Sequence, residues 1–270
     1  MTSFWAKNKP YRLARAPACE AMSLAERYET GEDISHTLSP KELAQFAEMK
    51  FPKRRRDWLA GRLAAKRLIV ELLSEQGRDV QPSEIAVLNR KDGSPYVVFS
   101  DAAGGDAPPI SLSHAPGGAV AASIVPAAVP AAGRIGVDAE SVMERPESFV
   151  TVFAHPSERL GLDTPQAQTR LWTLKEAVLK LLELGLSVDL WDVRFLARED
   201  IGRQEHCPAN AFPKGQPCVS DRKCPPLDSL LRLEMHGRAL SRWESFGRPA
   251  IRFDSDVSGA EALSVAYTGG

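Results

Sequence analysis

Two carboxylates in the middle of the sequence are spaced to hold a divalent cation. Asp138 and Glu140 stand in an apolar segment, 134–140, that we expect to be a strand, so both side chains point to one face. Carboxylates this close repel each other unless a cation or a proton intervenes. They suit Mg²⁺, which takes oxygen ligands and commonly keeps waters and substrate phosphate oxygens as its other ligands. The alternative is a polar strand face at a domain edge, which the apolar neighbours Ile135 and Val137 disfavour.

A third carboxylate lies in a segment with helical periodicity. Apolar residues recur at helical spacing over 171–182, which predicts a helix with one buried side. Lys175 and Glu176 interrupt this pattern, and Lys180 follows Glu176 by one turn. A packed helix with these groups could serve a metal and a phosphate together. The alternative is a Glu–Lys pair on a solvated face, worth about 0.2–0.5 kcal/mol.

Basic residues and a histidine in the first half could bind phosphate. Lys50, Lys53 and Arg54–Arg56 form a basic cluster in a chain whose net charge is only −1. Ser113 and His114 end an expected strand before a Gly-rich turn, where a histidine can donate to a phosphate oxygen. The alternatives are a solvated helix entrance and a structural histidine. All these groups together indicate a diphosphate-containing substrate better than any one of them does.

The elements that must position these groups predict an α+β fold. Ser39-Pro40-Lys41-Glu42 has the sequence of a capping box, followed by a helix and then by a long core helix over 58–73. The helix that carries Glu176 is expected to run from about 172 to 184. The expected strands are 85–88, 96–99, 110–114, 119–125, 134–140, 231–235, 250–253 and 262–267.

The two halves of the chain can be aligned as an internal repeat. Ser39–Glu42 resembles His155–Glu158, and Trp58 then pairs with Trp172 in an ungapped helix alignment that also pairs Lys66 with Lys180. Chance similarity of two amphipathic helices is the alternative.

The repeat predicts two pseudo-symmetric αβ lobes with the active site in the cleft between them. The Pro/Ala-rich segment 126–133 marks the boundary. Residues 1–126 would form a basic lobe that binds the substrate, and residues 127–270 a lobe that carries the metal ligands and the catalytic helix.

Composition excludes several classes of protein. The 270 residues are 43% hydrophobic and 26% charged, which is ordinary for a globular protein. The net charge of −1 gives no global attraction to nucleic acid or to a membrane surface. No apolar run reaches the roughly 18 residues of a membrane span, and the N-terminus lacks a signal-peptide core, so we expect a cytoplasmic protein. Four cysteines do not indicate a disulfide framework.

Two motifs carry a resemblance to a known family. Gly136–Glu140 and Trp172–Lys180 resemble the paired GxDxE and WxxKEAxxK motifs of the 4′-phosphopantetheinyl transferase superfamily. The first-half segments Trp58–Lys66, Gly93-Ser94-Pro95 and Ser113-His114 are similar to those of its long, surfactin-type branch, in which two similar halves are fused in one monomer. The resemblance covers about residues 39–184.

The resemblance implies a specific reaction. Such enzymes, which include holo-[acyl-carrier-protein] synthase, move the phosphopantetheine arm of coenzyme A to a serine of an apo carrier protein and release adenosine 3′,5′-bisphosphate. Asp138, Glu140 and Glu176 would hold Mg²⁺, and Glu176 matches the residue proposed as general base. Lys180 and His114 would bind phosphate during catalysis.

The resemblance also implies which residues contact coenzyme A. They are Lys50, Lys53, Lys66, Gly93, Ser113, His114, Lys175 and Lys180. This sequence departs from the family pattern at Ser94, where a basic residue is common, and at Lys66, where an arginine is common. The segment 197–227, with three cysteines whose spacing does not match a zinc knuckle, has no counterpart that we can place.

Two other functions stay open at this stage. A Mg²⁺-dependent phosphohydrolase of a nucleotide diphosphate would share the carboxylates but would need no carrier protein. A non-catalytic module that binds carriers is disfavoured because every carboxylate of the motifs is present. The sequence does not say whether a fatty-acid, polyketide or nonribosomal-peptide carrier would be served.

Overall fold

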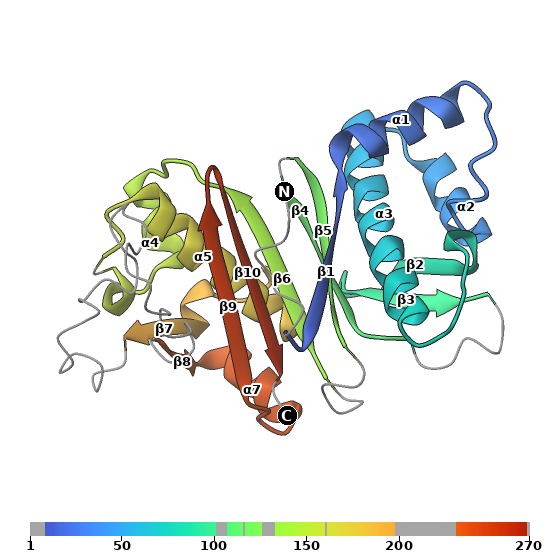
Figure 1. The fold of residues 1–270 in the computed structure, drawn as a ribbon. Helices are drawn as coiled ribbons and strands as arrows, with labels where there is room; N and C mark the ends of the chain where they lie inside the picture. The colour runs from blue at the N-terminus through green and yellow to red at the C-terminus, as the bar shows by residue number, and fades with distance from the viewer. Residues whose placement is uncertain are drawn as a thin grey trace, which may run out of the picture. The chain divides into compact units, whose positions relative to one another are not determined.

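The computed structural model describes residues 9–100, 107–115, 117–125, 133–159, 161–197 and 231–268. The chain divides into two compact units, and the division falls after Val137. Residues 126–132, where the sequence predicts a linker, lie outside the described residues, as does most of the cysteine-containing segment 197–227. Each unit has its own helices and sheets (Figure 1).

The first unit contains a three-stranded antiparallel sheet, a hairpin and three helices. The strands of the sheet lie in the order β1-β5-β4, and the long helix α3 packs against it. In chain order the elements are β1 (Tyr11–Pro17), α1 (Ala18–Glu29), α2 (Pro40–Glu48), α3 (Pro52–Ser74), the 3₁₀ turn η1 (Pro82–Glu84), β2 (Ile85–Asn89), β3 (Pro95–Phe99), β4 (Ile110–Ala115) and β5 (Gly118–Ile124).

The second unit contains a three-stranded sheet in the order β6-β10-β9, an antiparallel pair β7-β8, and helix α5 packed against β10 and β9. The division falls within β6, whose Asp138–Ser141 part belongs to this unit. In chain order the elements are β6 (Ile135–Ser141), α4 (Glu147–Phe153), η3 (Pro156–Glu158), α5 (Pro165–Leu181), η4 (Leu190–Asp192), β7 (Val193–Ala197), β8 (Leu231–Met235), α7 (Gly237–Ser245), β9 (Ile251–Ser258) and β10 (Glu261–Thr268).

The mixed helix and antiparallel-sheet content agrees with the predicted α+β class, and the predicted strands and long helices are present. The capping box at Ser39 is confirmed: Ser39 accepts from the Glu42 amide, and Glu42 accepts from the Ser39 amide. Strand β1 was not predicted, because its segment lacks apolar alternation. Helix α7 was missed although Ala239 and Trp243 stand one turn apart and both pack in the core of the second unit. Among the described residues no helix has the length and apolar character needed to cross a bilayer.

The capping glutamate of the first unit also forms a buried ion pair. Lys66 on α3 lies 2.6 Å from a carboxylate oxygen of Glu42, and these side chains are 2% and 0% exposed. The other Glu42 oxygen accepts from the Val87 amide of β2. The Lys66 ammonium also donates to the carbonyls of Pro82 and Ile85 at 2.6 and 2.5 Å. One carboxylate and one ammonium group therefore join α2, α3 and the start of β2.

The second unit has the same set of contacts. Glu158 accepts from the His155 amide at the start of η3 and from the Phe195 amide of β7. Lys175 on α5 lies 2.7 Å from Glu158, and neither side chain is exposed. Its ammonium also donates to the carbonyls of Phe153 and Leu190. By these contacts Lys175 is the equivalent of Lys66, whereas the ungapped sequence alignment paired Lys66 with Lys180.

These contacts bear on the predicted roles of Lys66 and Lys175. An ammonium group has three hydrogens, and the three acceptors of Lys66 and of Lys175 are protein atoms. Burial lowers the pKa of both lysines, and the neighbouring glutamate opposes that effect. The structure thus gives Lys66 and Lys175 a structural role within each unit, whereas their contact with coenzyme A stays a prediction.

Candidate functional site

The other predicted site residues fall into two sets, one in each unit. In the second unit, β6 carries Asp138 and Glu140, and α5 carries Glu176 and Lys180. The Lys180 ammonium donates to the Asp138 carboxylate at 2.7 Å, and Asp138 is only 4% exposed. The structure thus brings the carboxylates of β6 together with side chains of α5 that lie 36 to 42 positions later in the sequence.

Burial and neighbouring charge raise the pKa of two carboxyl groups of this set, Glu140 and Glu176. Burial, followed by the charge of Asp138, raises the pKa of Glu176 to about 7, and Lys180 partly opposes the shift. Burial and Asp138 also raise the pKa of Glu140, which accepts a hydrogen bond from the Trp172 side chain. A carboxyl group that titrates near neutral pH can accept a proton from a substrate hydroxyl and return it.

The chemistry of this set fits a hard cation. Glu176 is 7% exposed, and its Oε1 is buried without a hydrogen-bond partner. Such an oxygen is costly when ionised unless a positive charge approaches it. Within the described ranges no three or more His, Cys, Asp or Glu side chains are grouped as a metal site, and Lys180 supplies the charge beside Asp138. The residues present are nevertheless oxygen donors of the kind that Mg²⁺ takes.

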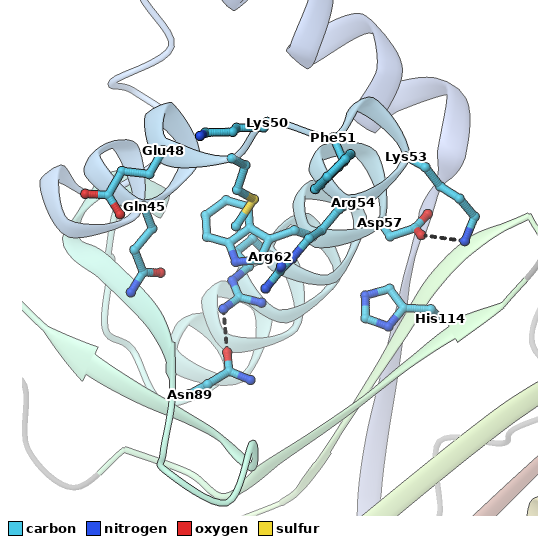
Figure 2. A pocket seen from close by; sticks show the side chains of 12 residues that line it. Gln45, Glu48, Lys50, Phe51, Lys53, Arg54, Asp57, Arg62, Asn89 and His114 are labelled. Atoms are coloured by element: carbon cyan, nitrogen blue, oxygen red, sulfur yellow. Dashed lines mark hydrogen bonds and ion pairs between the residues drawn. The ribbon is translucent and has the colours of Figure 1, made fainter.

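In the first unit a basic pocket of about 1160 Å³ collects several of the predicted residues. Figure 2 shows its side chains, which come from the end of α2, the start of α3 and the ends of β2 and β4. The lining residues are Gln45, Glu48, Met49, Lys50, Phe51, Lys53, Arg54, Asp57, Trp58, Arg62, Asn89 and His114. Lys50, Lys53 and His114, which the sequence separated by up to 64 positions, therefore lie in one pocket.

Arg62 is the most unusual residue of the pocket. It is 4% exposed, and burial lowers the pKa of its guanidinium to about 10. One terminal nitrogen donates to Asn89 Oδ1 at 2.6 Å, as the dashed line in Figure 2 marks, whereas Nε is buried without a partner. The guanidinium lies 4.3 Å from the centre of the Trp58 ring. A buried guanidinium with a donor left over is a strong site for an anion.

Other predicted residues lie near Arg62, and one of its hydrogen-bond partners is itself fixed by a further hydrogen bond. Asn89 donates in turn to the carbonyl of Gly93, which has a φ of 89° in the turn between β2 and β3. Gly93 thus binds the asparagine that accepts from Arg62, and it is not among the residues that line the pocket. Lys53 pairs with Asp57 at 3.2 Å on the exposed side. Ser113 is buried beside His114 at the end of β4.

Sequence reasoning missed Arg62 and Asn89 as site residues, and it named Arg54 only as a member of the basic cluster. Arg62 carried a usable signal, because it stands within the core helix next to the buried positions Leu59 and Gly61, where a charge needs a reason. Asn89 carried none, since an asparagine at the end of a strand is ordinary turn composition.

One family model matches a middle part of the chain. Residues 134–216, less than half of the chain, match the family model of the 4′-phosphopantetheinyl transferase superfamily. This match supports a phosphopantetheinyl transferase. The segment contains Asp138, Glu140, Glu176 and Lys180, and its last part lies outside the described residues. No curated protein matches the sequence.

A solved structure, that of the Plasmodium yoelii acyl carrier protein synthase with ADP bound, is 20% identical to this chain. The similarity covers 43% of this chain and 92% of that one, with a TM-score of 0.34. That score is too low to carry a structural conclusion.

Proposed function

We propose that this protein transfers the 4′-phosphopantetheine arm of coenzyme A to a serine of an apo carrier protein and releases adenosine 3′,5′-bisphosphate. The observation that carries the proposal is the family match over 134–216, which contains the carboxylate and lysine residues that the structure groups on β6 and α5. The basic pocket of the first unit supports it independently, because the nucleotide end of coenzyme A is anionic.

The reaction requires a general base for the serine proton and stabilisation of the negative charge that develops on the leaving bisphosphate. The serine oxygen forms a bond to the pantetheine-bearing phosphorus of the pyrophosphate, and the bond from that phosphorus to the bridging oxygen breaks. The serine proton passes to Glu176, whose raised pKa suits a proton acceptor near neutral pH. Negative charge moves to the leaving bisphosphate, where Lys180 can donate to it after leaving Asp138.

The carboxylates would also hold a metal. Asp138, Glu140 and Glu176 would bind Mg²⁺, which supplies positive charge to the pyrophosphate. In the metal-free protein Lys180 balances part of the carboxylate charge. Removing Mg²⁺ with a chelator is therefore expected to abolish transfer without unfolding the chain.

The first-unit pocket is proposed to bind the phosphates and base of the bisphosphate end. Arg62 donates from a buried position, and Lys50, Arg54 and His114 add donors at the same pocket. Charge-assisted hydrogen bonds of this kind are worth about 1.5–3 kcal/mol each.

A finer proposal is the surfactin-type, two-lobed branch. The two sheets, β1-β5-β4 and β6-β10-β9, have the same topology. In each, the last strand in chain order lies in the centre, between the first strand and the strand that precedes it in the chain. Glu42 and Glu158 each accept from a cap amide, a strand amide and a lysine, and each lysine also donates to two backbone carbonyls. These features support two units derived from one αβ repeat. A monomer that acts on a carrier protein is the corresponding expectation.

The experiment that tests the binding half is titration with adenosine 3′,5′-bisphosphate. Arg62→Met is expected to weaken binding by roughly 10- to 100-fold, the equivalent of one charge-assisted hydrogen bond. The control is Arg67→Met on the same helix, since Arg67 pairs with Glu20 at the surface outside the pocket. Equal affinities for wild type and Arg62→Met would contradict the proposed role of the pocket.

A second experiment separates transfer from hydrolysis. Coenzyme A with Mg²⁺ and no carrier is expected to remain intact, and bisphosphate is expected only when an apo carrier is added. Release of bisphosphate without a carrier at the same rate would favour a phosphohydrolase.

A further inference from the structure

Gly61 lies in the middle of α3, one residue before Arg62, and is buried. A Cβ atom added to it would lie 3.3 Å from Nε2 and 3.9 Å from Cε1 of His114, and 3.8 Å from a methyl carbon of Leu112. The first distance is shorter than ordinary van der Waals contact. The Nε2–Cε1 edge of the His114 ring therefore lies next to the position that the Cβ atom of any other residue at 61 would occupy.

A glycine inside a helix is unfavourable, because it costs more backbone entropy than alanine and adds no packing. Many glycines of this chain, Gly93 among them, have a positive φ that disfavours other residues. Gly61 has ordinary helical geometry, so backbone conformation does not explain it. The nearest atoms to its missing Cβ are all side-chain atoms, so a close approach of the sheet backbone does not explain it either.

We infer that Gly61 is a positioning residue: its lack of a side chain lets the His114 imidazole lie against α3, at the pocket that Arg62 also lines. The inference rests on the proposed function of that pocket. His114 reaches it from β4, whereas Arg62 reaches it from α3, so Gly61 sets how the two donors are placed together. A Cβ at this position displaces the ring by a few tenths of an ångström.

The test is the variant Gly61→Ala, which is expected to fold at least as well as wild type because alanine favours the helix. Its affinity for adenosine 3′,5′-bisphosphate is expected to fall by roughly fivefold, less than the ~100-fold that a 1 Å misplacement can cost. Gly117→Ala is the matched control, since a Cβ at Gly117 meets nothing within 4 Å. It is expected to bind with wild-type affinity.

A double-mutant cycle separates positioning from a general effect on the helix. In a His114→Ala background, Gly61→Ala is expected to change the affinity by less than twofold, because the displaced ring is gone. The NMR signals of the His114 ring are expected to shift in Gly61→Ala and to stay in place in Gly117→Ala.

The outcomes distinguish this inference from the proposed function. If wild type binds the bisphosphate and depends on His114, but Gly61→Ala binds equally well, only the role of Gly61 is overturned. An equal loss in both backgrounds also overturns it, in favour of a purely structural glycine. If wild type does not bind the bisphosphate at all, the proposed function of the pocket fails first.

Discussion

Glu176, the proposed general base, lies in an environment that is unfavourable for a charged carboxylate. Its carboxyl group is 7% exposed, near a second carboxylate, and its Oε1 accepts no hydrogen bond. A protein gains no stability from an ionised group in such a place, so the residue has a functional explanation rather than a structural one. The sequence pointed to it through the interruption of an apolar helix pattern, although a surface ion pair explained that pattern equally well.

The raised pKa of Glu176 predicts how stability depends on pH in the metal-free protein. Between about pH 4.5 and 7 the folded state keeps a proton on Glu176 that the unfolded state has released. The stabilisation is therefore complete below pH 4.5 and is lost as the pH rises through about 7, with a slope of at most ~1.4 kcal/mol per pH unit.

The measurement is urea unfolding of wild type and Glu176→Gln in a chelator at several pH values. Because other groups titrate in both proteins, the difference between the two curves is the quantity to compare. That difference should change between pH 4.5 and 7 and level off above it. A constant difference would mean that Glu176 titrates alike in the folded and unfolded chains.

At the scale of elements, two glutamate–lysine pairs join a helix start, a long helix and a strand in each unit. The capping box at Ser39 could be read from the sequence, because caps are local and their residue types are distinctive. The burial of Lys66 and Lys175 could not, because it depends on strands that pair later in the chain and leave carbonyls of Pro82 and Leu190 facing the ammonium groups. The sequence pattern of a lysine within an apolar helix is the same whether its ammonium group binds a substrate or a buried backbone carbonyl.

Lys66→Met and Lys175→Met are each expected to lower the free energy of unfolding by about 3–5 kcal/mol, because each leaves a buried glutamate unpaired. Lys41→Met, an exposed change on α2, should alter it by less than about 0.5 kcal/mol.

Adding Glu158→Gln to Lys175→Met should restore part of the loss, since the uncompensated charge is then gone. Chemical denaturation measures all four variants. A loss at Lys175 as small as that at Lys41 would contradict the structural role of Lys175.

Strand β1 and helix α7 were not predicted from the sequence. The β1 strand, with two arginines and two alanines in seven residues, lacks apolar alternation and is defined by its pairing with β5. Helix α7 is short, but its apolar residues Ala239 and Trp243 stand one turn apart and pack in the core of the second unit, so its pattern was a usable signal that was missed. In both cases the contact that stabilises the element comes from a distant part of the chain.

At the scale of the whole molecule, each unit contributes a different half of the proposed chemistry. The first contributes a basic pocket with a buried arginine, and the second contributes the carboxylates and Lys180. Motif spacing predicted that Asp138, Glu140, Glu176 and Lys180 lie together, because the two motifs place them on a strand and a helix that pack in one unit. The first set was predicted only in part, because basic side chains can reach a phosphate from many positions, and the sequence does not say which are buried.

The most direct test of the account is the intact mass of an apo carrier protein after incubation with this enzyme, coenzyme A and Mg²⁺. The wild-type protein should add the mass of one phosphopantetheine to the carrier, and Glu176→Gln should add almost none while unfolding at a similar urea concentration at neutral pH. An unmodified carrier with every class tried, or full modification by Glu176→Gln, would contradict the account.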